Sequence, residues 1–209
     1  MVFVMAFLWG VLFSSIGIAL PGLINMTAAK TSVRDGKTRA LVFTAGALVI
    51  IFIQAYIAVA FAKLINSKPD LIMMLQEIGL VLFSLLTIYF FFIAKKPKLK
   101  SEEEPKVRTK VGRFFLGMLL SALNFFPIPY FVFVSVSLAN NKHIIFAPLN
   151  NFLFVIGVTV GSFAVFYLYI IFFKKIEHKT EWMMRNLNYF LGTITGIVAL
   201  VNLIKIFRN

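Results

Sequence analysis

Long uninterrupted apolar segments dominate this chain of 209 residues. Each of six such segments reaches or exceeds the roughly 20 residues that a helix needs to cross a bilayer. Their Phe, Leu, Ile and Val residues show no alternation with a period of two, which favours helices over a β-barrel. We therefore predict an all-α membrane protein with six transmembrane helices, at residues 2–29, 40–62, 71–94, 114–139, 144–173 and 187–206.

The composition excludes several other classes of protein. Hydrophobic residues make up 60% of the chain and charged residues 14%, against about 45–50% and 25% in soluble domains. Because the chain has no cysteine, it is not a disulfide-stapled secreted module. His143 and His178 lack metal-ligand spacing, so we predict no metal site and no cofactor. Without a cysteine, a mid-span acid or a mid-span histidine, we also predict that the protein is not an enzyme.

The basic residues, 21 against 8 acidic ones, are distributed unevenly among the predicted loops. Sixteen lie in the loops around 30–39, 95–113 and 174–185, which connect the spans on one side, and five lie elsewhere. By the positive-inside rule we place this basic side in the cytoplasm and both termini outside the cell membrane. The excess charge thus indicates topology and predicts no nucleic-acid partner.

The hydrophilic linker at 95–113 divides a single transmembrane domain into two halves, about 1–94 and 114–209, with three predicted spans each. Weak similarity relates these halves at offsets of 107 and 111 positions. Because three is an odd number, the second copy must be inverted relative to the first, an arrangement that recurs in transporters. The matched residues include Phe7, Gly10 and Ser14 with Phe114, Gly117 and Ser121, and Phe43 and Gly46 with Phe154 and Gly157.

Helix breakers occur at corresponding places in the first and fourth spans. Pro21 and Gly22 interrupt the first, and two prolines separated by one residue interrupt the fourth. Such breaks are either simple kinks or openings of the backbone toward a polar solute. A symmetric pair, each with an asparagine nearby, favours the second interpretation. The predicted solute-binding residues are Ser14, Pro21, Gly22, Asn25, Gln54, Ser121, Asn124, Pro127 and Pro129.

Gln54 lies midway along the second span. Its amide can either face a central cavity or hydrogen-bond to a neighbouring helix.

The order of these features is similar to that of the LysE/RhtB family of small amino-acid exporters, over nearly the whole chain. That family has six spans, a Pro-Gly-Pro sequence in the first helix, and in the fourth a Gly followed seven residues later by Asn-Pro-Lys. Here Pro21-Gly22 stands at the first position, and Gly117 is followed seven residues later by Asn124. The resemblance implies a membrane exporter of small amino acids.

Two departures from the family pattern bear on the solute. Leu23 replaces the second proline of the first motif, and Phe125-Phe126 replaces Pro-Lys in the second, although prolines follow shortly after. Because the family's lysine is absent, no particular amino acid is carried over.

We therefore expect an exporter of amino acids or similar small polar metabolites, working by alternating access between inverted repeats in the lipid bilayer. Glycine pairs spaced by four residues, at 157–161 and 192–196, allow close helix approach within one chain or in a homo-oligomer. The main alternative is a non-transporting scaffold or assembly subunit, whose centre would be filled by apolar side chains. A small-ion transporter is less favoured, because no carboxylate is evident at mid-membrane depth.

Overall fold

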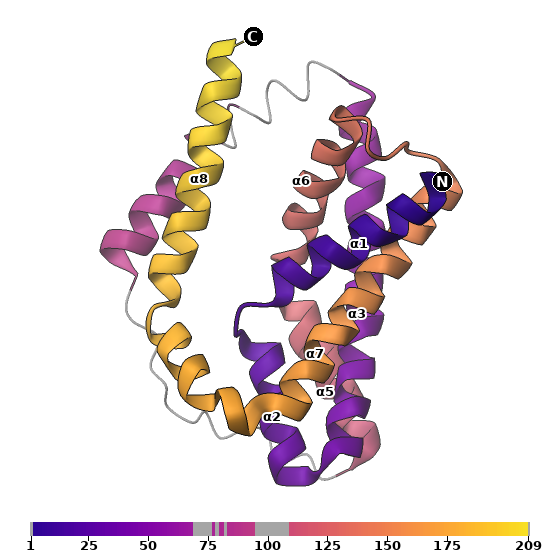
Figure 1. The fold of residues 1–209 in the computed structure, drawn as a ribbon, viewed down its shortest axis with the longest axis vertical. Helices are drawn as coiled ribbons and strands as arrows, with labels where there is room; N and C mark the ends of the chain where they lie inside the picture. Colours follow the sequence, from indigo (N-terminus) through magenta and orange to yellow (C-terminus); the bar gives the residue numbers. More distant parts are fainter. Residues whose placement is uncertain (1, 69–76, 78–79, 82, 95–108, 209) are drawn as a thin grey trace. The chain divides into compact units, whose positions relative to one another are not determined.

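The structure is a computed structural model that describes residues 2–68, 77, 80–81, 83–94 and 109–208. Within these residues the regular structure is helical and contains no strand (Figure 1). The prediction of an all-helical protein is therefore confirmed for the described part of the chain. The elements are α1 (Val2–Ile18), α2 (Leu23–Asp35), α3 (Lys37–Asn66), a π-helical turn η1 (Tyr89–Ile93), α5 (Lys110–Leu123), α6 (Pro127–Asn140), α7 (Pro148–Arg185) and α8 (Leu187–Arg208).

By length and composition, the described residues hold two to four candidate membrane spans. The segments Lys37–Asn66 and Pro148–Phe172 qualify individually. Two bent pairs qualify together, α1 with α2 at an angle of 80° and α5 with α6 at 63°. Part of the predicted third span, 71–94, lies outside the described residues, and its described residues include a shorter apolar helix, Phe83–Ile93. Six spans and two inverted repeats remain predictions.

Two basic segments that we expected to be loops are helical. In the first of them α2 continues to Asp35, Gly36 makes the turn with a φ of 91°, and α3 begins at Lys37. In the second, α7 continues to Arg185. A change in hydropathy marks where lipid contact ends, and a helix can extend beyond that point into the aqueous phase. The loop prediction was therefore wrong about conformation at these two places.

The fold divides into two compact units. The first comprises Met1–Leu64 and Glu102–Glu177, and the second Ile65–Ser101 and His178–Asn209. The first unit thus contains α1, α2, α5, α6 and most of α3 and α7. The prediction of one transmembrane domain made of two sequence halves stays a prediction.

Within the second unit, η1 and α8 pack against each other through small and polar residues. Thr87 and Thr195 are joined by a hydrogen bond of 3.0 Å between their hydroxyl oxygens. The Asn188 amide donates to the carbonyl oxygen of Ala94 at 2.9 Å. These bonds satisfy polar groups that would otherwise be costly in an apolar environment.

Within the first unit, α3 buries its small residues and exposes many of its large ones. Ala40, Ala47 and Ala55 are fully buried, whereas Ile53 and Phe61 are about half exposed. A water-soluble core would show the opposite distribution, with the large apolar side chains inside. The pattern is the one expected for a helix that packs closely against other helices and presents its bulky side chains to lipid.

Close backbone contact joins α1 to α7 at a pair of glycines. A Cβ atom added to Gly10 would lie 2.2 Å from the carbonyl oxygen of Phe154, and one added to Gly157 would lie 2.1 Å from that of Phe7. Both distances are far below a van der Waals contact. Only glycine therefore permits these two helices to cross so closely.

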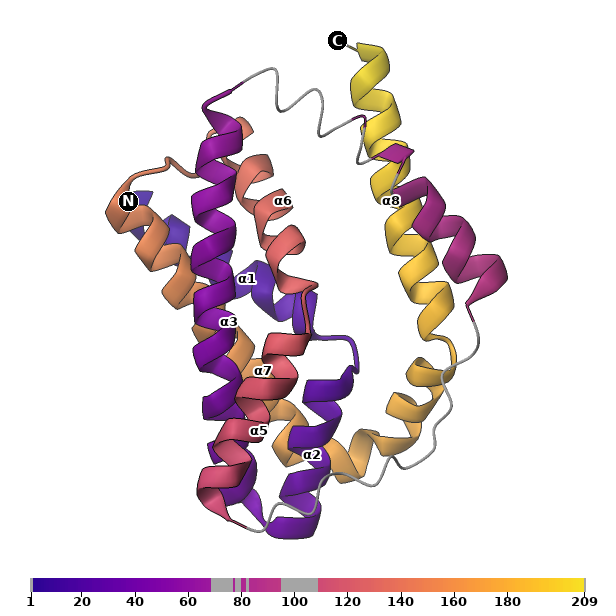
Figure 2. The same cartoon turned by 180° about the vertical axis from the view of Figure 1, so that it is seen from behind.

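A second pair of glycines joins α3 to α5, which lie side by side in Figures 1 and 2. A Cβ atom added to Gly46 would lie 2.0 Å from the carbonyl oxygen of Phe114, and one added to Gly117 would lie 2.0 Å from that of Phe43. Each broken helix therefore meets one of the two long spans at a glycine crossing.

Candidate functional site

The first helix break separates α1 from α2. The α1 helix ends at Ile18, and the chain is non-helical until α2 begins at Leu23. Pro21 lies inside this segment, where its missing N–H and fixed φ angle prevent helix continuation. Gly22 is the N-cap residue of α2, with φ −133° and ψ 177°, and no side chain caps the helix. The break lies where the sequence predicts it.

The second break separates α5 from α6. The α5 helix ends at Leu123, and Asn124 is extended, with φ −87° and ψ 96°. The Asn124 side-chain oxygen accepts a hydrogen bond of 3.3 Å from the N–H of Phe126. Pro127 then occupies the first position of α6, where proline is well tolerated because that N–H has no intrahelical partner. This break also lies where the sequence predicts it.

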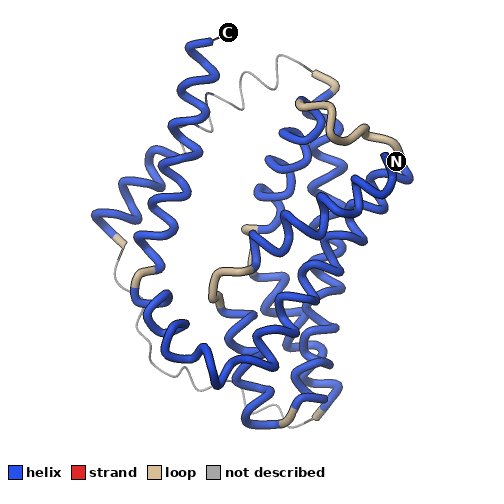
Figure 3. The backbone as a smooth tube through the Cα atoms, in the orientation of Figure 1, coloured by secondary structure: helices blue, strands red, loops and turns tan. Residues whose placement is uncertain are grey.

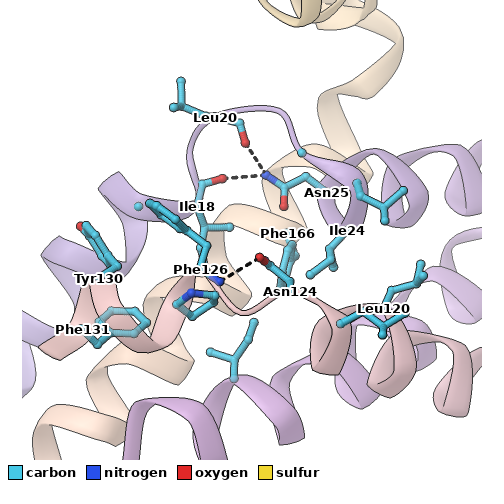
Figure 4. Close-up of a pocket in the computed structure, with 16 residues that line it drawn as sticks. Ile18, Leu20, Ile24, Asn25, Leu120, Asn124, Phe126, Tyr130, Phe131 and Phe166 are labelled. Atoms are coloured by element: carbon cyan, nitrogen blue, oxygen red, sulfur yellow. Dashed lines mark hydrogen bonds between the residues drawn. The ribbon is translucent and has the colours of Figure 1, made fainter. Parts of the chain in front are cut away.

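One buried amide side chain stabilises the carbonyl groups at the first break. The Asn25 amide nitrogen donates to the carbonyl oxygens of Ile18 at 2.6 Å and of Leu20 at 2.9 Å (Figure 4). These carbonyls lie at the end of α1, where intrahelical donors have run out. Asn25 therefore fixes the shape of the first break.

A second buried amide side chain, on another helix, stabilises the carbonyl groups at the second break. The Gln54 amide nitrogen on α3 donates to the carbonyl oxygens of Ser121 at 3.1 Å and of Asn124 at 2.9 Å. Of the two roles expected for Gln54, the structure shows the hydrogen bond to a neighbouring helix. The Gln54 side-chain oxygen and the Ser121 hydroxyl are buried beside these carbonyls and make no hydrogen bond in the described part of the chain.

The starts of α2 and α6 differ in the backbone donors that they offer. In α6, Pro127 and Pro129 have no N–H, and the N–H of Ile128 donates to the carbonyl oxygen of Phe125 at 3.3 Å. In α2, which lacks a side-chain cap, the N–H of Met26 donates the first helical hydrogen bond. The positive end of the α2 dipole is thus the better place for a carboxylate.

A cavity of about 390 Å³ lies between the two breaks (Figure 4). Both breaks and the adjoining ends of α1, α2, α5 and α6 form its wall, together with residues of α3 and α7. The tube in Figure 3 shows the two interruptions as loops within the helices. None of the described residues that line the cavity is an aspartate, glutamate, histidine, lysine or arginine. They are Gly17, Ile18, Leu20, Gly22, Leu23, Ile24, Asn25, Ile51, Leu120, Leu123, Asn124, Phe126, Pro127, Tyr130, Phe131 and Phe166.

Aromatic residues of α6 form part of this wall. The rings of Phe126 and Tyr130 are stacked, with centroids 5.9 Å apart and planes inclined by 20°. The Tyr130 hydroxyl donates to the carbonyl oxygen of Phe13 on α1 at 2.7 Å. Sequence reasoning missed these aromatic residues. Phenylalanine is so frequent in the chain, with 25 residues, that no single one is conspicuous.

The predicted solute-binding residues fall into two groups in the structure. Four of them line the cavity: Gly22, Asn25, Asn124 and Pro127. The other five lie near the breaks and do not line it.

Of those five, four are buried and one is exposed. Ser14 is fully buried and donates to the carbonyl oxygen of Val11 at 3.2 Å. The other buried members of this group are Pro21, Gln54 and Ser121, and the exposed one is Pro129.

A buried ion pair joins the ends of α2 and α5 that lie away from the cavity. The Arg113 guanidinium is fully buried and contacts the Asp35 carboxylate. Its other terminal nitrogen lies 3.4 Å from the Thr31 hydroxyl. Arg34 and Arg39 also contact Asp35, through its carboxylate and its backbone carbonyl respectively. Sequence analysis assigned these residues only to the basic loops and did not predict this ion pair.

No group of three or more histidine, cysteine, aspartate or glutamate side chains that could hold a metal ion occurs among the described residues. The polar groups at the cavity are instead backbone amides and carbonyls, two asparagines and a tyrosine hydroxyl. Such groups can bind a small solute by hydrogen bonds and helix dipoles.

Comparison with known proteins agrees with this arrangement. The sequence profile of LysE type translocators matches residues 15–205, nearly the whole chain. No curated protein and no solved structure shows significant similarity to it. The resemblance inferred from Pro21-Gly22, Gly117 and Asn124 is confirmed, and the chain is a membrane protein of transporter type. It belongs to the LysE type translocator family.

Proposed function

We propose that this protein exports amino acids or similar small polar metabolites across the cell membrane by alternating access between inverted repeats. The observation that carries the proposal is the cavity between the two helix breaks. In transporters with inverted repeats, solutes bind near the midplane where discontinuous helices meet. A simple kink would account for one break, but it would not account for two breaks that share one cavity.

The glycine crossings support the inverted repeats. Gly10 and Gly117 are matched by the repeat offset of 107, and Gly46 and Gly157 by the offset of 111. Gly10 and Gly157 meet at the α1–α7 crossing, and Gly117 and Gly46 at the α5–α3 crossing. Exchanging the two halves therefore exchanges one crossing for the other. Chance similarity between phenylalanine-rich helices would not generate this reciprocal pattern of contacts.

Two contacts support alternating access by separating the paths to the two sides. The α2 and α5 helices run from the cavity to the Asp35–Arg113 pair. The α1 and α6 helices contact each other instead through the Tyr130 hydroxyl and the Phe13 carbonyl. With the basic side in the cytoplasm, both termini outside and the linker 95–113 cytoplasmic, we assign the first contact to the cytoplasmic path. We assign the second to the external path.

The polar chemistry of the breaks supports a small polar solute. The uncapped start of α2 offers backbone N–H groups and a positive dipole end to a carboxylate. Asn25 and Asn124 line the cavity, one at each break, and their amide side chains can hydrogen-bond to a solute. A scaffold subunit would have no need for these arrangements.

The small-ion alternative is less well supported. A site for a divalent cation requires oxygen ligands that normally include carboxylates. The cavity residues include no carboxylate, and Asp35, the nearest acidic residue in sequence to the first break, pairs with Arg113 instead.

The experiment starts from the metabolites that cells secrete with and without this protein. Solutes whose release depends on it are then tested as labelled substrates in proteoliposomes. We expect Gly22→Phe to reduce their transport to background, because Gly22 lies on the cavity wall and a Cβ atom added there meets nothing within 4 Å, which leaves room for a ring in the path of the solute. Leu12→Phe is the matched control, at an exposed position of α1 away from the cavity. Unchanged transport by folded Gly22→Phe protein would contradict the proposal.

A further inference from the structure

Phe126, at the second break, lines the cavity and is 56% exposed. It stacks on Tyr130, and the Tyr130 hydroxyl is held by the carbonyl oxygen of Phe13. This hydrogen bond and the close contact of the Tyr130 ring with Gly17 fix the orientation of the platform on which Phe126 lies. The pair is therefore an ordered aromatic surface that faces the cavity.

The surroundings of this aromatic surface are apolar. Phe131 and Phe166, both almost fully buried, and Ile51 also line the cavity. A charged group placed among them would lose its hydration without meeting a side chain of opposite charge. An aromatic ring would instead gain apolar contact and ring–ring interaction with Phe126.

The cavity wall also carries polar groups, some of them at the start of α2. The first turn of α2, at Leu23, Ile24 and Asn25, supplies uncapped backbone N–H groups. The Asn25 amide nitrogen is already engaged by two carbonyls, and the Asn124 side-chain oxygen accepts from Phe126. The cavity thus combines uncapped backbone N–H groups at the start of α2 with aromatic rings on α6. Figure 4 shows two of these rings, Tyr130 and Phe131, on one wall of the cavity.

We propose that Phe126 and Tyr130 determine specificity by selecting solutes that combine a carboxylate with an uncharged apolar, preferably aromatic, side group. This inference rests on the proposed transport function and narrows it to one solute class. The carboxylate binds toward the start of α2, and the apolar group packs against the aromatic pair. Solutes with cationic or small hydroxylated side groups are poor substrates, because the described cavity residues give a cation no counter-charge and a small side group makes little contact with the aromatic pair.

The test uses the full chain in proteoliposomes with labelled phenylalanine, leucine, serine and lysine as probes. We expect transport of phenylalanine and leucine to exceed that of serine and lysine by about tenfold or more. Phe126→Ala should raise the KM for phenylalanine roughly three- to tenfold, the range that corresponds to losing one aromatic pair. It should change the KM for leucine less.

Phe125→Ala is the matched control for this substitution. Phe125 is the neighbouring ring, is 71% exposed and does not line the cavity, so its removal should leave the selectivity unchanged. Phe126→Leu retains most of the apolar volume and guards against misfolding of the alanine variant. It should preserve leucine transport while still raising the KM for phenylalanine.

The outcomes separate this inference from the transport function itself. If the folded wild-type protein transports serine or lysine at the same rate as phenylalanine, the aromatic subsite is refuted and the transport function stands. An unchanged phenylalanine-to-leucine ratio in both Phe126 variants would also refute the subsite. If neither these probes nor any secreted metabolite is transported, the proposed function fails and this inference fails with it.

Discussion

Replacing the crossing glycines by alanine should destabilise the protein strongly. At the α3–α5 crossing, a Cβ on Gly46 or Gly117 would lie 2.0 Å from a backbone carbonyl oxygen, whereas ordinary contact begins at 3.4 Å. The two helices would have to separate by about 1.4 Å, and a close-packed interior resists such a shift. Overpacking typically costs about 1–3 kcal/mol, and a backbone obstacle belongs at the upper end. We expect each alanine to lower the free energy of unfolding by about 3 kcal/mol.

The midpoint of thermal unfolding in detergent measures this effect. For a chain of this size, 3 kcal/mol corresponds to a decrease in Tm of roughly 6–12 °C. At the α1–α7 crossing, Gly10→Ala and Gly157→Ala should give decreases of similar size, because the Cβ distances are 2.2 and 2.1 Å. Gly22→Ala is the control, since nothing lies within 4 Å of its added Cβ and its φ of −133° suits alanine.

Two results would refute this reasoning. One is a loss of stability at one crossing and none at the other, because the reciprocal contacts require both to respond. The other is a decrease for Gly22→Ala as large as that for the crossing glycines, because it would mean that Tm reports a general intolerance of alanine.

Three further predictions concern polar groups that shape the breaks and the ion pair. Asp35→Asn removes the carboxylate that pairs with buried Arg113, and it should lower the free energy of unfolding by about 3 kcal/mol; a loss below 1 kcal/mol in denaturant titrations would show that the pair contributes little. Gln54→Met retains the length of the side chain without its donors. It should lower the free energy of unfolding by about 1–3 kcal/mol and reduce transport, because two carbonyl groups lose their hydrogen-bond donor. Full transport activity in vesicles would contradict a positioning role for Gln54. Asn25→Leu should act in the same way at the first break, with a loss of similar size. A Tm equal to that of the wild type would show that water replaces the amide.

The positions of the two breaks could be predicted from local chemistry alone. Proline lacks the backbone donor that a continuous helix needs, and this effect does not depend on the rest of the fold. Pro21 and Pro127 therefore mark the breaks directly. The predicted asparagines also lie at the breaks, although Asn124 accepts from a backbone N–H of its own segment.

The long-range contacts made by the broken helices could not be predicted in the same way. Gln54 is 67 positions from Ser121, and Arg113 is 78 positions from Asp35. Neither pairing leaves a signal in the local sequence, because each depends on how the helices cross. The aromatic wall was missed for a different reason, since Phe126 lies among many phenylalanines that face lipid.

The helix ends show a second limit of sequence reasoning. The basic residues around 30–39 mark the edge of the apolar segment, yet they lie on α2 and α3, which are separated by Gly36 alone. Charge reports contact with water or lipid headgroups, whereas helix termination depends on backbone conformation. Only the positive φ of Gly36 ends the helix there.

Labelling of a single cysteine in the cavity tests the central claim most directly. The natural chain contains no cysteine, so Leu23→Cys introduces one reactive thiol, at an exposed position of the cavity wall. Leu119→Cys, exposed on α5 away from the cavity, is the control. We predict that a membrane-impermeant thiol reagent labels the Leu23→Cys variant. A transported solute should slow this labelling without changing the labelling of the control variant. Labelling at the same rate with and without saturating transported solute would contradict a solute site between the two breaks.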